Sequence, residues 1–188
     1  MMEKLLNKRL TNMQNKNSIR LMIYASLFTS LIIIGSYITI PTGIVPIVLA
    51  NMFIFILALV LPVKWSVTSV TIYLLLGGLG LPVFSGASGG LHHFFGPTGG
   101  YLLGYLLASF IISLISFKKP NRIKDILALL AGFFTIHFLG IVWLIYRFPQ
   151  GWIKSLPIYW IFLIGDLCKM LIALVLAPKI RQRIAERD

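Results

Sequence analysis

The chain has 188 residues, of which 58% are hydrophobic and only 12% are charged, and its mean hydropathy is +0.91. Soluble domains contain about 25% charged residues, and a fold of this length has too much surface for its volume to bury so many apolar side chains. The composition therefore excludes an ordinary soluble enzyme and a disordered chain, and the single cysteine, Cys168, excludes a disulfide scaffold. We expect an all-α integral membrane protein.

Six apolar stretches are candidates for membrane-spanning helices, each of which needs roughly 20 residues to cross about 30 Å of hydrocarbon. The stretches are continuous rather than alternating in polarity, which favours helices over the strands of a barrel. The second and third are short and are interrupted by Pro or Gly. The predicted spans are about 21–40, 44–61, 65–82, 99–117, 126–146 and 158–177.

The net charge of +12 is explained by membrane topology and requires no nucleic-acid partner. Most of the 17 Lys and Arg lie in alternate segments, which are the N-terminal arm, the turn at 62–64, the loop 118–125 and the C-terminal tail. The opposite segments hold only Arg147 and Lys154. Because cytoplasmic segments of membrane proteins collect Lys and Arg, we expect both termini in the cytoplasm. The predicted regions are a basic arm at 1–20, a six-helix domain at 21–178 and a basic tail at 179–188.

The N-terminal region resembles a signal peptide in its basic charge, but its apolar run is too long. A cleaved signal has an apolar core of about 7–15 residues, whereas this run has about 20 and no A-x-A-like site follows. We therefore expect an uncleaved first span. The chain also lacks a G-x-x-x-x-G-K-[ST] motif, so any energy input is expected from an ion gradient or a partner.

Ten of the 16 glycines lie between Gly77 and Gly104, in a segment that joins the third and fourth spans on the predicted outer side. Irregular backbone near membrane depth is tolerated where it is buried in protein or lines a cavity. We therefore expect Ser85–Thr98 to form a lid or a pocket wall. The alternative is a flexible loop next to a helix-packing motif at Gly100-x-x-x-Gly104. Large apolar residues inside the loop favour the pocket wall: Leu91, Phe94 and Phe95.

Asp166 is the only acid inside a predicted span, and Lys169 follows it three residues later on the same helix face. Charged groups within a bilayer are costly, usually face the bundle interior and often mark a functional site. We expect a polar ligand site in the outer half of the membrane, beneath the glycine-rich loop. The alternative is an ion pair that only helps to pack the bundle.

Other polar residues carry weaker signals. Asn51 in the second span either contacts a ligand or bonds a neighbouring helix, and His137 in the fifth span is expected to be a packed interior residue. His92 and His93 are expected in a loop, and three scattered histidines do not predict a metal site. No catalytic group of residues is found. Small residues that suit close helix contact repeat on the first span as Ala25-x-x-x-Thr29 and Ser26-x-x-x-Ser30.

Four stretches of the chain resemble one family of membrane proteins. They are IPTGIVPIVLAN at 40–51, IYLLLGGLGLPVFSGASGGLHHFFGPTGGYLLGY at 72–105, FLGIVWL at 138–144 and FLIGDLCKMLIALVLA at 162–177. In order and spacing, over about 30–180, they closely resemble BioY, the biotin-binding S component of energy-coupling factor (ECF) transporters. The GLPVF…GG…GPTGGY block and the late GD-x-x-K are the specific features.

The resemblance implies a six-helix bundle that binds biotin from the outside, in a pocket between helices that the 85–98 loop caps. S components of this type work with a transmembrane coupling protein and two ABC-type ATPases, and the whole S component is thought to topple in the membrane. ATP is then used by the partners, and the chain needs no cofactor or metal of its own. The resemblance implies a multi-pass protein of a prokaryotic cell membrane that is not an enzyme.

The resemblance also implies roles for individual residues. Asp166 and Lys169 match the family's polar ligand pair, and Ser88, beside Gly89 and Gly90, stands where relatives can have Asn. The coupling-protein contact on the first span is present as Ala25/Thr29 or Ser26/Ser30 rather than as two alanines. The remaining expected substrate contacts are Asn51, Tyr73, Phe94, Tyr101 and Trp143.

Biotin suits this site because its ureido ring offers two N–H donors and a carbonyl acceptor, and its tail ends in a carboxylate. Asp166 accepts from ureido N–H, whereas Lys169 donates either to the ureido carbonyl or to the carboxylate. The sequence leaves the orientation of biotin open. Two other functions stay open as well: an S component for another vitamin, such as thiamine or riboflavin, and a small intramembrane enzyme or assembly subunit.

Overall fold

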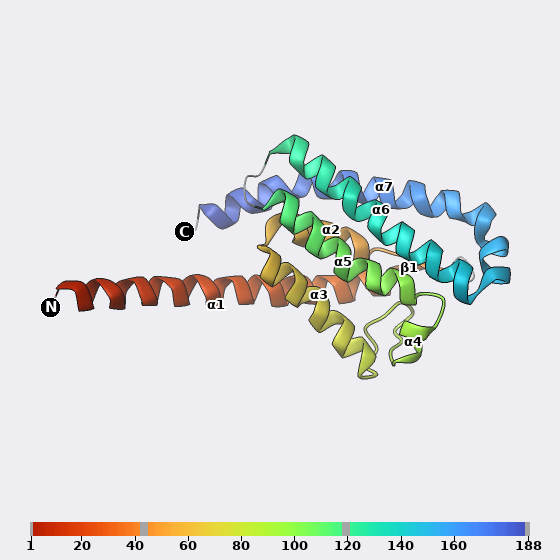
Figure 1. The fold of residues 1–188 in the computed structure, drawn as a ribbon, viewed down its shortest axis with the longest axis horizontal. Coiled ribbons are helices and arrows are strands. Elements are labelled where there is room, and N and C mark those ends of the chain that lie inside the picture. The colour runs from red at the N-terminus through yellow and green to blue at the C-terminus, as the bar shows by residue number, and fades with distance from the viewer. Residues whose placement is uncertain (1, 42–44, 118–120, 187–188) are drawn as a thin grey trace.

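The computed structural model describes residues 2–41, 45–117 and 121–186, and within these ranges it is mostly helical (Figure 1). A two-stranded antiparallel hairpin of β1 (Thr39–Ile40) and β2 (Ile47–Val48) joins the first two helices. The helical class is as predicted. The helices are α1 (Met2–Tyr37), α2 (Ala50–Val60), α3 (Val63–Gly78), the one-turn α4 (His92–Phe95), α5 (Gly99–Ser116), α6 (Arg122–Arg147) and α7 (Pro149–Ala185).

Helix α2 lies at the centre of the bundle. It contacts all five of the other long helices, and nine of its 11 residues are buried. Its sequence, ANMFIFILALV, is apolar on every side except at Asn51, as expected for a helix surrounded by protein. The central position of α2 carries Asn51 and the preceding strand β2 into the interior of the bundle.

The helices do not coincide with the six predicted spans. Among the described residues, four helical segments are long and apolar enough to cross a membrane: Asn15–Tyr37, Gly99–Ser116, Arg122–Arg147 and Tyr159–Ile184. Within the predicted span 44–61, a hairpin strand precedes α2, and the 11 residues of that helix rise only about 16 Å. Within the predicted span 65–82, α3 stops at Gly78 and the chain then turns through Gly80 at φ +96°.

Helices α1 and α7 extend well beyond their predicted spans. Helix α1 begins at Met2 rather than near residue 21, and α7 covers Pro149–Ala185 rather than 158–177. The added residues include many Lys, Arg, Gln and Leu, which are good helix formers, together with four Asn and three Pro. Hydropathy marks the part of a helix that suits lipid, and it does not mark where the helix ends.

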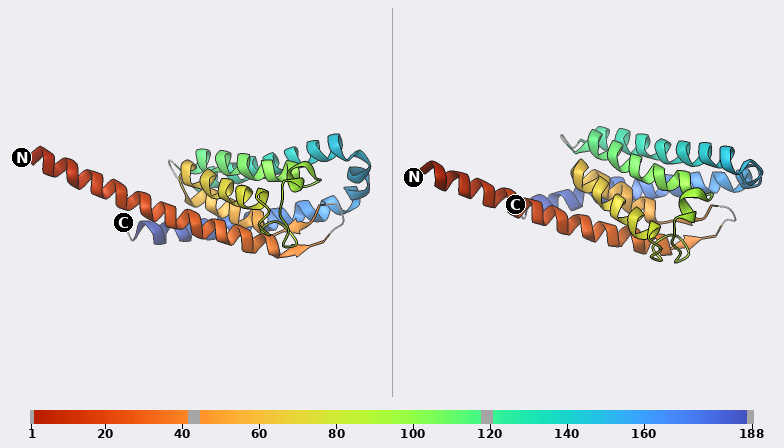
Figure 2. Two further views of the ribbon diagram at one scale, coloured as in Figure 1. Left: turned by 90° about the horizontal axis from the view of Figure 1, so that it is seen from below. Right: turned by 60° about the horizontal axis from the view of Figure 1, so that its bottom comes forward.

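The two ends of the chain lie at one end of the bundle, and α4 and the hairpin lie at the other (Figure 1). The two further views in Figure 2 show the same arrangement, with the first turns of α1 extending beyond the other helices. Near the termini, Asp125 in the first turn of α6 is buried and pairs with Arg181 of α7. The predicted loop 118–125 and tail 179–188 therefore each contribute a residue to the packed fold.

Gly100 and Gly104 lie where α5 packs against α6. A Cβ atom at Gly100 would come within 2.4 Å of the Trp143 Cβ, and one at Gly104 within 2.9 Å of the Ile136 Cα. Only glycine allows the two helices to approach this closely. The small-residue pattern at these two positions is thus a packing motif, which fixes the end of α5 next to the glycine-rich loop.

Candidate functional site

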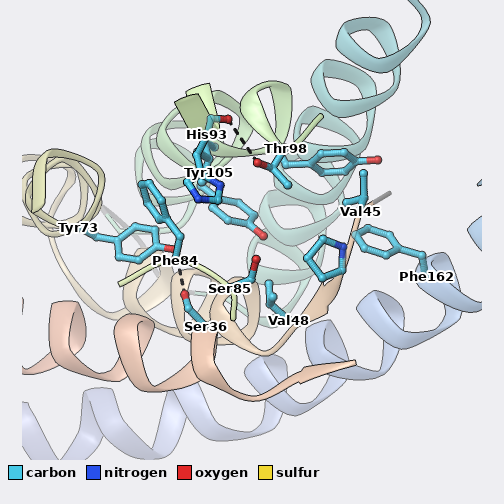
Figure 3. A pocket seen from close by; sticks show the side chains of 13 residues that line it. Ser36, Val45, Val48, Tyr73, Phe84, Ser85, His93, Thr98, Tyr105 and Phe162 are labelled. Carbon is cyan, nitrogen blue, oxygen red and sulfur yellow. Dashed lines mark hydrogen bonds between the residues drawn. The ribbon is translucent and has the colours of Figure 1, made fainter. Parts of the chain in front are cut away.

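A cavity lies at the α4 end of the bundle, enclosed by the hairpin, the loop after α3 and parts of α1, α3, α5 and α7 (Figure 3). Room inside it for a water-sized molecule is limited to about 30 Å³, and part of the cavity opens to solvent. Its wall is mainly apolar and aromatic with a few hydroxyl groups, which is typical of a small-molecule site. The lining residues are Ser36, Val45, Pro46, Val48, Tyr73, Phe84, Ser85, His93, Thr98, Tyr101, Leu102, Tyr105 and Phe162.

Two of the predicted substrate contacts, Tyr73 and Tyr101, line this cavity. The Tyr73 hydroxyl lies 2.9 Å from the Ser36 Oγ, which joins α3 to α1. The Tyr101 ring lies against Gly140 of α6, where a Cβ atom would come within 2.4 Å of the ring. The Tyr101 ring also meets the Phe162 ring of α7 at a centroid distance of 5.7 Å. Both tyrosines are therefore held by neighbouring helices.

The loop after α3 folds back over the helix end and brings aromatic residues into the wall. Its path needs positive φ angles at Gly80, Gly86, Ala87 and Gly90, a conformation that glycine adopts without steric cost. The Gly90 N–H donates to the carbonyl of Gly77 at 2.6 Å. As predicted for 85–98, this segment forms a pocket wall, to which it contributes Ser85, His93 and Thr98.

Ser88, Gly89 and Gly90 shape the loop and are not among the side chains that line the cavity. The Ser88 hydroxyl donates to the carbonyl of Ser85 at 2.7 Å. Gly89 packs so closely on the preceding turn that a Cβ atom would come within 2.1 Å of the Leu81 carbonyl oxygen. The close packing of Gly89 and the positive φ angle of Gly90 explain why glycine is needed at both positions, without any contact to a ligand.

Phe94 and Trp143 support the wall from behind. The Phe94 ring contacts the Phe84 ring at a centroid distance of 5.9 Å. The Trp143 indole N–H donates to the carbonyl of Gly96 at 2.8 Å, which ties α6 to the loop. Neither side chain lines the cavity, so the structure gives both of them a supporting position.

Asp166 and Lys169 form the buried ion pair that their spacing on α7 predicts. The Lys169 Nζ lies 2.8 Å from the Asp166 Oδ1, and it also donates to the carbonyl of Val48 at 2.7 Å. Asp166 is 1% exposed and Lys169 is 8% exposed. A buried pair of this kind is strongly coupled to its surroundings, because removing either partner leaves an uncompensated charge.

The carboxylate has further polar neighbours that the sequence did not assign to it. The His137 Nε2 lies 3.3 Å from the Asp166 Oδ2, and the Tyr159 hydroxyl lies 3.0 Å from the His137 Nδ1. Asn51 of α2 is also close enough to act on this carboxylate. The expectation of a packed interior position for His137 is correct, but its contact with Asp166 depends on the packing of α6 against α7.

The ion pair lies directly beside the cavity, although neither side chain is among those that line it. Lys169 donates to the carbonyl of Val48, and Val48 lines the cavity. Phe162, one helical turn before Asp166, also lines it. Val48 and Phe162 are therefore the lining residues next to which the pair lies.

The two small-residue patterns on α1 face different ways. Ala25 and Thr29 are buried against α3, where the Ser69 hydroxyl donates to the carbonyl of Ala25 at 2.8 Å. Ser26 and Ser30 are exposed on the outer face of the helix. Only the second pair is accessible to another protein in this fold.

Several lining residues were not named as site residues in the sequence analysis. Ser85, His93 and Thr98 lie in the loop that the sequence singled out, and Phe162 precedes Asp166 by one turn, so signals for these existed. Ser36 gave no signal, because its position depends on how α1 crosses α3. The other lining residues missed were Val45, Pro46, Val48, Phe84, Leu102 and Tyr105.

A family model described as BioY family matches residues 8–186. The chain belongs to the BioY family. A relative named biotin transporter BioY, from Thermotoga maritima, is 37% identical over 169 residues, which cover 89% of this chain and 99% of the relative. Another relative with that name, from Lactococcus lactis subsp. cremoris, is 32% identical over 91% of this chain and 95% of its own.

The fold of the chain is also similar to that of a solved structure. The chain is similar to the crystal structure of the S-component for biotin from an ECF-type ABC transporter, with a TM-score of 0.80 and 31% identity. The match covers 89% of this chain and 94% of that one. The four apolar helices and the similarity to prokaryotic transporters together indicate that this BioY-family chain is a membrane protein.

Proposed function

We propose that this chain is the biotin-binding S component of an ECF transporter and takes part in biotin uptake, not in catalysis. The observation that carries the proposal is the buried Asp166–Lys169 pair beside an aromatic cavity, in a chain of the BioY family. The pair is neutral overall and offers both an acceptor and a donor, which suits the ureido ring of biotin. The aromatic wall suits its apolar bicycle.

The proposed topology has six membrane-embedded helices, α1, α2, α3, α5, α6 and α7, in a multi-pass protein of the prokaryotic cell membrane. Basic residues gather at the end of the bundle that carries both termini, which supports a cytoplasmic location for that end. The cavity then opens to the outside. Helix α2 is short, and the buried hairpin residues Ile47 and Val48 complete its path, since irregular backbone is tolerated where protein surrounds it.

The energy for uptake comes from partners in this proposal. The chain carries no phosphate-binding G-x-x-x-x-G-K-[ST] motif, so ATP is used by two ABC-type ATPases joined through a transmembrane coupling protein. The exposed Ser26 and Ser30 of α1 form the contact surface for that coupling protein. No cofactor is needed, and biotin is the substrate.

Binding of labelled biotin to the purified full chain, without partners, tests the proposal. Asp166→Asn and Lys169→Met are expected to weaken binding by roughly 30-fold or more, as for other buried charge pairs that lose one partner. Lys179→Met, an exposed position on the same helix, is the matched control and is expected to bind as the parent does. Equal biotin affinity in all four proteins would disprove the site.

Competition with other vitamins separates biotin from the second candidate. Unlabelled thiamine and riboflavin are expected to leave labelled biotin bound, whereas unlabelled biotin displaces it. If thiamine or riboflavin displaces the label at lower concentration than biotin does, the chain is an S component for that vitamin. If none of the three binds, the intramembrane enzyme or assembly subunit becomes the better hypothesis.

A further inference from the structure

His93 projects from the one-turn helix α4 into the wall of the cavity, on the side away from Phe162 (Figure 3). Its position is fixed at three points. Its backbone N–H donates to the carbonyl of Gly90 at 3.2 Å, and its own carbonyl accepts from the Thr98 hydroxyl at 3.3 Å. Its ring meets the Phe84 ring edge-on at 5.3 Å. The imidazole is therefore held toward the cavity.

The Nε2 atom of His93 is buried and has no hydrogen-bond partner among the described residues. Leaving a buried polar atom unpaired costs free energy that a partner would restore. The neighbouring hydroxyls do not reach it, since Thr98 bonds the His93 carbonyl and the Tyr73 hydroxyl contacts Ser36. A ligand in the cavity is the partner that the geometry leaves available.

Among the described residues that line the cavity, His93 is the only one whose side chain can gain a positive charge. The other titratable groups that line it are the phenols of Tyr73, Tyr101 and Tyr105. The cation beside the cavity, Lys169, is already paired with Asp166 at 2.8 Å and with the Val48 carbonyl. Among the described residues, a ligand carboxylate therefore finds no uncommitted lysine or arginine beside Asp166.

We propose that His93 binds the carboxylate of biotin and takes up one proton from solvent when biotin binds. The inference rests on the proposed function and adds an orientation to it: the ureido ring lies toward Asp166 and Lys169, and the carboxylate tail lies toward α4. The resulting imidazolium–carboxylate bond is charge-assisted, which makes it stronger than a bond between neutral groups. Thus the Nε2 atom gains the partner that it lacks.

The sign of the pH dependence follows from the surroundings of His93. Burial, and to a smaller extent the neighbouring His92, lowers the pKa of His93 below its usual value of 6.5. The imidazole is then neutral at pH 7, and a bound carboxylate raises its pKa. Biotin affinity is therefore expected to increase as the pH falls through the pKa of His93 in the complex, and to level off below its pKa in the free protein. Carboxylates like that of biotin stay ionised above about pH 5.5.

The experiment measures the affinity of the purified full chain for biotin and for biotin methyl ester, between about pH 5.5 and 8. The ester keeps the ureido ring and lacks the ionised carboxylate. Because the ester differs from biotin only at the carboxylate, the groups proposed to meet the ureido ring, such as Asp166 and Lys169, are expected to act equally on both ligands. The ratio of the two affinities therefore isolates the carboxylate. In the parent protein the ratio is expected to favour biotin by about 10- to 100-fold at pH 6, the range for a charged hydrogen bond, and to shrink as the pH rises.

His93→Gln is expected to remove this preference and its pH dependence, and a cooperative thermal unfolding transition verifies that the variant is folded. His92→Gln, an exposed neighbour on the same turn, is the matched control and retains the preference. A parent protein that binds biotin and the ester equally at every pH overturns the role of His93 and leaves the proposed function intact. A parent protein that binds neither ligand overturns both.

Discussion

Arg181 of α7 binds Asp125 of α6 through two hydrogen bonds, from Nη1 to Oδ2 at 2.8 Å and from Nη2 to Oδ1 at 3.1 Å. The same guanidinium donates to the carbonyl of Leu59 at the end of α2, with Nε at 2.7 Å. The Ser116 hydroxyl of α5 also bonds this carboxylate. One ion pair therefore joins four helices at the end of the bundle opposite the cavity.

Loss of this pair is expected to destabilise the fold. Arg181→Met leaves the buried Asp125 uncompensated, which costs about 3–5 kcal/mol for buried pairs in other proteins. Thermal unfolding of the purified chain in detergent measures the loss. Arg183→Gln is the control, because that exposed side chain faces Glu186 at 3.6 Å and surface pairs contribute little. Similar melting temperatures for the two variants would refute a structural role for Arg181.

The close contact of Gly89 with the Leu81 carbonyl predicts that the loop does not tolerate a side chain there. Gly89→Ala forces the loop to shift, because its Cβ would come within 2.1 Å of that oxygen. We expect biotin affinity to fall by about tenfold or more, as a displaced wall contributes fewer contacts. Gly165→Ala, where a Cβ meets open space, is expected to keep parental affinity. Unchanged binding in Gly89→Ala would show that the wall does not need this backbone path.

The exposed small residues of α1 predict a separation between binding and transport. Ser26→Leu with Ser30→Leu adds bulk to the outer face of α1, so association with the coupling protein and cellular biotin uptake are expected to fall. Binding of biotin to the purified chain is expected to stay at the parental level. Co-purification with the coupling module checks the first effect. A double variant that still associates fully would place the contact elsewhere.

Thr29→Leu is the matched change on the buried face of the same helix. The Thr29 hydroxyl bonds the carbonyl of Ser69 at 3.2 Å, and Leu overfills this contact, which costs about 1–3 kcal/mol of stability. We therefore expect a lower melting temperature in this variant but not in the outer double variant. Equal stability of the two would contradict the assignment of the inner and outer faces.

The proposed topology is tested with single cysteines in a Cys168→Ala chain. Leu91→Cys lies in the loop after α3, and Lys124→Cys lies in the first turn of α6. A membrane-impermeant maleimide added to intact cells is expected to label the first position and to label the second only after permeabilisation. The reverse pattern would invert the orientation.

The sequence alone determined the class of the protein, the glycine-rich wall and the ion pair on α7. Each of these can be predicted without knowing which helices meet. Composition excludes a soluble fold, and residues three apart on a helix share a face. The resemblance of the GLPVF and GD-x-x-K stretches gave the family, which the comparisons confirm. The helix ends were less predictable, because hydropathy measures suitability for lipid and not the continuity of backbone hydrogen bonds.

Only the tertiary structure decided which residues face one another. Whether Ala25 or Ser26 is accessible depends on how α1 packs on α3, and whether His137 meets Asp166 depends on how α6 packs on α7. The same holds for Arg181 and Asp125, which lie 56 positions apart in the chain. Such contacts arise from the packing of helices distant in sequence, and neither spacing nor composition encodes them. The low share of charged residues thus predicted a membrane protein. Which charged residues pair with one another depends on how the helices pack.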